Sequence, residues 1–209
     1  MRRLFTSLIS VVLVFSASVF ASEENVEAKA EPGPSEVVQS VTSSLLAAAR
    51  DNTDLLRTDP EAYFAKIRSL LEPSVDFESI AKNVMGKKYW LSASEAQRST
   101  FVETFTRSLV ETYGKGMANF ADLDIKVESD RPSERSQSTH YVVQSVSGDG
   151  GPVKIAYTMG HTDKGWRLRN VTLDGVNLGK TFRSQFDQAV KDANNDLDVA
   201  IASWGQEAK

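Results

Sequence analysis

Apolar side chains in the N-terminal half of the chain recur every three or four positions, which is the period of an amphipathic helix. Asp59 and Pro60 form a strong helix start, because a capping carboxylate is followed by proline at the first helical position. Asp76 is a second N-cap candidate, and Gly86 is a candidate C-terminal stop. The pattern predicts helices over residues 35–57, 60–72, 77–86 and 95–117.

The longest predicted helix has the clearest signal. It begins at Ser92 or Ser94, because each serine has a capping-box partner three residues later, Glu95 or Gln97. Its apolar stripe is broad and presents aromatic side chains on one face. The stripe consists of Phe101, Val102, Phe105, Leu109, Val110, Tyr113 and Met117.

Beyond Phe120 the apolar period changes from about 3.6 to 2, which is typical of strands with one buried face. Strands are predicted around residues 123–128, 141–146, 153–159 and 166–173, with turn sequences at 147–151 and 162–165. Connections this short join antiparallel neighbours. This part of the chain therefore predicts an antiparallel meander.

The last predicted strand has a slip in its apolar phase. Trp166 and Leu168 are even-numbered, whereas Val171 and Leu173 are odd-numbered. A β-bulge near residues 169–170, or a strand covered on both faces at its far end, would explain this change.

The chain returns to a helical pattern at residues 177–191, and residues 192–209 form a weakly amphipathic tail. The order is therefore helices, then strands, then a helix. This order predicts an α+β domain in which N-terminal helices pack on a curved antiparallel sheet.

The first residues have the pattern of a secretory signal. Two arginines precede the apolar run Leu4–Phe20, and Val19 and Ala21 are small residues at the positions that a signal peptidase reads. We expect a signal peptide over residues 1–21, a disordered acidic linker over 22–34 and a single domain over 35–209. An uncleaved membrane anchor is the alternative for the first segment.

Composition excludes several kinds of chemistry. The chain has no Cys, so it has no disulfide, thiol nucleophile, cysteine-ligated zinc or acylated lipoprotein cysteine. Removing residues 1–21 removes two arginines and no acidic residue, which changes the formal charge from −4 to −6. Such a chain is a poor candidate for binding nucleic acid. We expect an exported, soluble, mildly acidic protein.

Catalytic motifs give little support for an enzyme. His161 and Asp163 could form a base and its orienting carboxylate, but both lie at a predicted hairpin, where polar residues are common. The acidic residues near the C-terminus lack the Gly and Glu that a calcium loop needs. We therefore expect no catalytic residues, no metal site and no cofactor.

Large apolar side chains from the longest helix and the sheet are predicted to point toward one interior. They are Phe101, Phe105, Leu109, Tyr113, Met117, Ile155, Tyr157, Met159, Trp166, Leu168, Val171 and Leu173. The pattern fits an ordinary packed core, and it also fits an apolar cavity suited to acyl chains. Periodicity alone leaves both readings open.

The chain resembles a known family, the periplasmic phospholipid-binding proteins of the MlaC type, which are auxiliary components of an ABC transporter linked to toluene tolerance. Asp59-Pro60 before a Tyr-containing helix belongs to the matching pattern. The other matching segments are Phe77-Glu78-Ser79-Ile80-Ala81, Val84-Met85-Gly86, Tyr89-Trp90, Leu109-Val110-Glu111-Thr112-Tyr113, Gly165-Trp166-Arg167, Asp174-Gly175-Val176-Asn177-Leu178 and Phe182-Arg183-Ser184-Gln185-Phe186. The chain departs from the family pattern at Asn170, Gly179 and Phe182.

The resemblance implies a nuclear-transport-factor-like sheet with added helices, enclosing an apolar cavity that holds phospholipid tails. It implies a soluble monomeric periplasmic carrier that maintains outer-membrane lipid asymmetry. Its expected partners are an outer-membrane lipoprotein–porin complex and an inner-membrane ABC transporter with its lipid-binding ring subunit. A carrier of another amphiphile, such as a hopanoid, an enzyme on the same scaffold and a purely structural adaptor are the alternatives.

Overall fold

The structure is a computed structural model that describes residues 31–117, 124–148 and 151–204. The chain divides into two units, Met1–Ala30 and Glu31–Lys209. The predicted signal peptide and residues 22–30 of the predicted linker lie outside the described residues. Within the described ranges, no helix has both the length and the apolar character needed to cross a membrane.

Helices form the N-terminal and C-terminal parts of the second unit. They are α1 (Pro34–Asp51), α2 (Thr53–Thr58), α3 (Pro60–Leu71), α4 (Phe77–Ser92), α5 (Glu95–Met117), α6 (Leu178–Asp192) and α7 (Leu197–Trp204). The first predicted helix is divided in two at Asn52, whose backbone is not helical. The described part of the C-terminal tail contains α7, which buries Ala200, Ile201 and Trp204.

The helix starts follow the predicted capping chemistry. Asp59 and Asp76 each accept a hydrogen bond at 3.1 Å from the backbone N–H three residues later. Ser94 and Gln97 form the reciprocal capping box, with hydrogen bonds of 3.1 and 2.9 Å, and this choice places Ser92 in the preceding helix. Local capping signals therefore located three of the helix boundaries correctly.

Gly86 was predicted to end its helix, but in the structure it kinks the helix instead. Its φ of +74° interrupts α4, which continues to Ser92. A Cβ at this position would lie 2.9 Å from Nη2 of Arg183 in α6. Gly86 therefore permits both a left-handed backbone and a close approach between two helices.

The strands form one antiparallel sheet in the order β1-β2-β3-β4-β5. Their bounds are β1 (Asp124–Ser133), β2 (Ser136–Gly148), β3 (Gly151–Thr162), β4 (Gly165–Leu173) and β5 (Val176–Asn177). In the β3–β4 register Thr158 pairs with Asn170 and Met159 pairs with Leu168, which leaves Arg169 as an extra residue. The predicted bulge in the last long strand is confirmed.

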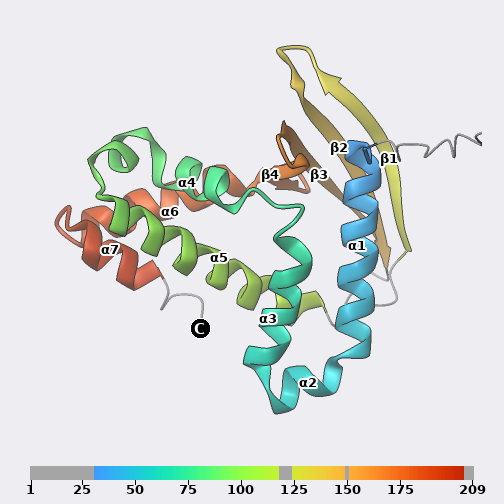
Figure 1. The fold of residues 1–209 in the computed structure, drawn as a ribbon, viewed down its shortest axis with the longest axis horizontal. Helices are drawn as coiled ribbons and strands as arrows, with labels where there is room; N and C mark the ends of the chain where they lie inside the picture. The colour runs from blue at the N-terminus through green and yellow to red at the C-terminus, as the bar shows by residue number, and fades with distance from the viewer. Residues whose placement is uncertain (1–30, 118–123, 149–150, 205–209) are drawn as a thin grey trace, which may run out of the picture. The chain divides into compact units, whose positions relative to one another are not determined.

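The described helices pack in two groups (Figure 1). Helices α4, α5, α6 and α7 pack on one another, whereas α1 packs on the sheet and on α3. α4 and α6 also contact β4. The fold is therefore the predicted α+β class, but α1 rather than the longest helix covers the sheet.

A short segment before α4 connects the helices to the sheet edge. Val75 forms a parallel bridge with Leu168, and the backbone of Ser74 and Asp76 hydrogen-bonds to Leu168 on both sides. The Asp76 carboxylate also accepts a hydrogen bond from Arg169, the bulged residue, at 3.2 Å. The bulge therefore directs a cation toward the start of α4.

Candidate functional site

The sheet has an apolar face and a polar face, because side chains alternate along each strand and directly paired residues share a side. We call the apolar side the inner face. In the described strands its apolar part, with Gln144 among it, consists of Ile125, Val127, Val142, Gln144, Val146, Val153, Ile155, Tyr157, Met159, Trp166, Leu168, Val171 and Leu173. The same register places Asp130, His140 and His161 at the polar end of this face. The opposite side carries polar groups such as Lys154, which forms an ion pair of 3.1 Å with Glu128.

Helix α1 seals one part of the inner face. Val38 of α1 packs with Val142 and Met159, and all three are nearly inaccessible to solvent. Trp166 and Leu168 pack around this cluster and are partly buried. This part of the inner face is an ordinary core.

The remainder of the inner face is only partly covered. Ile155 and Val171 are half-buried, and Leu173 and Val153 are 37% and 38% exposed. Val176, just beyond the end of β4, is 55% exposed. Large aliphatic side chains are therefore left accessible on one contiguous part of the sheet, which is a feature of ligand-binding and interaction surfaces.

A small polar cluster interrupts this apolar surface. Gln144 is 1% exposed, and its Oε1 accepts hydrogen bonds from the Tyr157 hydroxyl at 2.8 Å and the Thr42 hydroxyl of α1 at 3.3 Å. Burial raises the pKa of Tyr157 to about 12, so this hydroxyl remains protonated and a donor throughout the neutral range. The amide oxygen of Gln144 is therefore held by two donors.

Both histidines lie beside Trp166. His140 and His161 contact the Trp166 ring edge-on, with ring centroids 4.8 and 4.9 Å away. His140 hydrogen-bonds to Asp130 at 2.9 Å, and His161 hydrogen-bonds to Glu31 at 3.0 Å. The hypothetical base and carboxylate pair of His161 and Asp163 is therefore not formed in the structure.

The prediction that α5 and the sheet point their apolar side chains toward one interior is wrong for two residues of α5. Phe101 and Phe105 are fully buried, but they lie in an aromatic cluster with side chains of α6 and α7. Phe101 lies 4.6 Å from Phe186 and 6.0 Å from Trp204 between ring centroids. The reason is that helical periodicity identifies a buried stripe but not the element that buries it.

The other predicted residues of α5 occupy three different environments. Leu109 packs at the border of the aromatic cluster, and Met117 packs at the border of a second cluster between α1, α3 and α5. Tyr113 is 41% exposed. The helix therefore does not present one continuous surface to the sheet.

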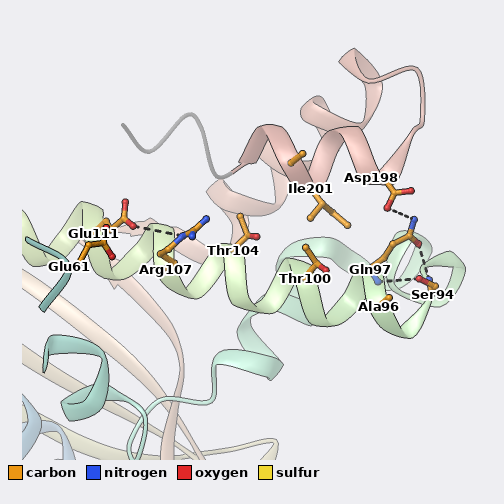
Figure 2. A pocket seen from close by; sticks show the side chains of 11 residues that line it. Glu61, Ser94, Ala96, Gln97, Thr100, Thr104, Arg107, Glu111, Asp198 and Ile201 are labelled. Atoms are coloured by element: carbon orange, nitrogen blue, oxygen red, sulfur yellow. Dashed lines mark hydrogen bonds and ion pairs between the residues drawn. The ribbon is translucent and has the colours of Figure 1, made fainter. Parts of the chain in front are cut away.

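A separate groove of about 620 Å³ lies along α5, α7 and the start of α3, and none of the predicted site residues lines it (Figure 2). Along it, Arg107 Nε lies 3.8 Å from Glu111 Oε1 in an ion pair, and Gln97 Nε2 donates a hydrogen bond to Asp198 Oδ1 at 3.1 Å. Thr100 and Thr104 lie between these pairs (Figure 2). A groove lined this heavily with polar groups is unsuited to a purely apolar ligand.

Several side chains of the inner face were not predicted from the sequence pattern. Val142, Gln144 and Val146 alternate along β2 in phase with β3, but the adjacent Val142 and Val143 obscure that phase in the sequence. Val38 of α1, which packs on Val142 and Met159, was not assigned to this surface either. Among the described residues, no group of three or more His, Cys, Asp or Glu side chains could hold a metal ion.

Comparison with known sequences and structures relates the chain to lipid-binding proteins. The family model described as MlaC protein matches residues 39–206. The toluene tolerance protein ttg2D of Pseudomonas putida is 33% identical over 175 residues, which cover 83% of this chain and 80% of that protein. The intermembrane phospholipid transport system binding protein MlaC of Haemophilus influenzae is 23% identical over 152 residues, or 71% of each chain.

A solved structure shares the fold. The phospholipid-binding protein from Ralstonia solanacearum, determined in complex with a phospholipid, superimposes with a TM-score of 0.75 at 19% identity. The match covers 85% of this chain and 97% of that one. The helices and curved antiparallel sheet are therefore a known arrangement.

Proposed function

The chain belongs to the MlaC family, and we propose that it binds phospholipid and carries it through an aqueous compartment. Relatives named for phospholipid transport and toluene tolerance support this proposal, as does a phospholipid-bound protein of the same fold.

One structural observation carries the proposal: the inner face is apolar but incompletely covered. Leu173 and Val153 are more than one-third exposed, and Ile155 and Val171 are half-buried, although all four lie on the same side of the sheet. Each methylene that a tail buries there contributes about 0.8 kcal/mol. Acyl chains that cover this surface are therefore stabilised together with the protein side chains.

The proposed contact residues are those of the inner face that remain accessible. Tails lie against Ile155, Tyr157, Val171 and Leu173, and Tyr113 is a further contact because its ring is substantially exposed. Phe101 and Phe105 support the fold from the aromatic cluster instead of touching the lipid. Met159 is fully buried under α1, in the part of the inner face that this helix covers.

The proposed setting is the periplasm, reached by means of the signal peptide over residues 1–21. There the protein, as a monomer, takes phospholipid from one membrane complex and gives it to another. Its partners are an outer-membrane lipoprotein–porin complex and an inner-membrane ABC transporter with its ring subunit. Exchange of this kind maintains outer-membrane lipid asymmetry and requires no reaction and no cofactor.

The test is the identity of the ligand in protein purified from the periplasm. Native mass spectrometry followed by lipid extraction is expected to find about one glycerophospholipid per chain, because the apolar surface favours a bound tail. A polycyclic lipid such as a hopanoid would replace phospholipid as the cargo. Protein that is consistently empty, and stays empty after mixing with phospholipid vesicles, would contradict the carrier function.

A further inference from the structure

Gln144 is a buried polar residue in a place where an apolar one would fit the surface. It lies on the inner face between Val142 and Val146 along β2, and it pairs across the sheet with Ile155. Burying an amide among aliphatic side chains costs free energy unless both ends find hydrogen-bonding partners.

Only one end of this amide has partners among the residues that the structure describes. Oε1 accepts from Tyr157 and Thr42, whereas Nε2 donates to no residue of the described chain. In the described residues, Arg167 Nε is the only side-chain polar atom that is both sealed from solvent and without a partner. The Gln144 Nε2 is therefore not completely sealed from solvent, although the residue as a whole is only 1% exposed.

The surroundings indicate the chemistry of the missing partner. An N–H group needs an acceptor, and no described inner-face position is occupied by Lys or Arg to balance the charge of a buried phosphate. The two histidines of this face, His140 and His161, already hydrogen-bond to the carboxylates of Asp130 and Glu31. A neutral acceptor is therefore favoured over an anion. Among the groups of a phospholipid, the ester carbonyls that join the tails to glycerol are neutral acceptors attached directly to apolar chains.

We infer that Gln144 donates a hydrogen bond from Nε2 to an ester carbonyl of the bound lipid, an inference that rests on the proposed function. Tyr157 and Thr42 are positioning residues, because by donating to Oε1 they turn Nε2 toward the lipid. The protein thereby distinguishes acyl-ester lipids from ether-linked lipids with the same tails and headgroup. An ether lipid lacks the carbonyl and leaves the buried N–H unpaired.

The experiment compares two lipids that differ only in this linkage. The full chain is incubated with vesicles that contain equal amounts of diacyl phosphatidylglycerol and dialkyl-ether phosphatidylglycerol of the same chain length. Native mass spectrometry then gives the ratio of the two bound lipids. The wild-type chain is expected to prefer the diacyl lipid about tenfold, the value for one buried hydrogen bond.

Two substitutions at Gln144 test the residue itself. Gln144→Met keeps the length of the side chain without its amide, and Gln144→Leu removes the amide and leaves only an aliphatic group. Both are expected to bring the ratio close to one. Gln185→Met on the exposed side of α6 is the matched control and keeps the tenfold preference.

The outcomes separate this inference from the carrier function. Equal binding of the two lipids by the wild-type chain, or a tenfold preference retained by Gln144→Met, overturns the role of Gln144 and leaves the carrier function standing. Binding of neither lipid by the wild-type chain overturns the proposed function itself. Because the wild-type ratio needs no substitution, a variant that fails to fold does not prevent the test.

Discussion

The aromatic cluster of Phe101, Phe105, Phe182, Phe186 and Trp204 and the inner face of the sheet are both apolar, but their packing differs. Within the cluster, Phe101, Phe105 and Phe186 have no solvent exposure. The ring centroid of Phe101 lies 4.6 Å from that of Phe186 and 5.7 Å from that of Phe105. On the inner face only the part under α1 reaches this level of burial.

This difference separates two roles that the same kinds of side chain can have. Rings that surround one another contribute their hydrophobic free energy to the folded state and leave no room for a ligand. Aliphatic side chains that remain accessible on a sheet contribute less hydrophobic free energy to folding, and they contribute the remainder only when another apolar surface covers them. The aromatic cluster therefore stabilises the fold, and the inner face is proposed to bind the lipid.

The largest effect is expected from Phe101→Ala. Removing a fully buried ring leaves a cavity between Phe105, Phe186 and Trp204 and lowers the free energy of unfolding by about 3–5 kcal/mol. Urea denaturation followed by circular dichroism measures the change. Leu91→Ala, at a side chain that is 66% exposed, is the control and changes stability by less than about 0.5 kcal/mol. Equal costs at the two positions would show that the aromatic cluster is not the main core.

A backbone substitution in each region is expected to have a smaller effect. Gly86 in α4 and Gly175 in the β4–β5 turn both have positive φ, at +74° and +83°. Gly→Ala at either position lowers the free energy of unfolding by about 1–2 kcal/mol, because Cβ disfavours that conformation. A Cβ added at Gly86 would contact the Arg183 side chain, whereas a Cβ added at Gly175 would contact nothing within 4 Å. The difference between the denaturation midpoints of the two variants therefore measures the cost of moving the Arg183 side chain.

A charge on the inner face is expected to reduce lipid binding more than stability. Leu173→Glu places a carboxylate where a tail is proposed to lie and weakens phospholipid binding about tenfold, or about 1.4 kcal/mol. Its unfolding free energy changes little, because Leu173 is already 37% exposed. Val199→Glu on α7, at a side chain that is 53% exposed, is the matched control. If both variants exchange lipid from vesicles like the wild-type chain, the inner face is not the binding surface.

The smallest effect is expected at Asp76, where α4 meets the sheet. Burial alone would raise the pKa of Asp76, but hydrogen bonds from Ser79 and Arg169 together hold it below its ordinary value. Because the folded-state pKa is depressed, its contribution is fully present above the ordinary value and is lost as the pH falls through the folded pKa. We expect this contribution to be roughly 0.5–1 kcal/mol, since the ion pair is partly exposed.

Asp76→Asn keeps the helix cap and removes the charge, so it isolates the pair with Arg169. Wild-type chain and variant are expected to differ in denaturation midpoint at pH 7 and to converge in acid. Asp59→Asn is the control. The Asp59 carboxylate accepts a hydrogen bond from the backbone N–H of Ala62 at the start of α3, and it forms no ion pair among the described residues. A difference that persists unchanged in acid would remove the electrostatic explanation.

Local signals predicted much of the fold because their physical causes are local. Capping at Asp59, Asp76 and Ser94 depends on side chains within three residues, and the bulge at Arg169 follows from the phase of its own strand. The kink at Gly86 was only half predicted. Its glycine indicated an interruption, whereas the continuation of α4 depends on packing against more distant helices.

The candidate site was predicted less well because it depends on which surfaces meet. The odd-numbered residues of β3 were correctly placed on one face, but their partners on β2 and α1 were missed. Phe101 and Phe105 were assigned to the interior beside the sheet, although they pack on α6 and α7. Except for Gln144, these side chains are apolar, so no local preference distinguishes one buried destination from another.

The amino-acid sequence by itself determined the helices and strands, their caps, the antiparallel order and the apolar side of each element, because periodicity and capping act over a few residues. Only the tertiary structure decided that α1 covers the sheet and that the aromatic side chains of α5 form a solid cluster. It also decided that the amide nitrogen of Gln144, on a partly open apolar face, has no partner among the described residues. The reason is that burial is a property of pairs of surfaces, and the pairing depends on the packing of the whole domain.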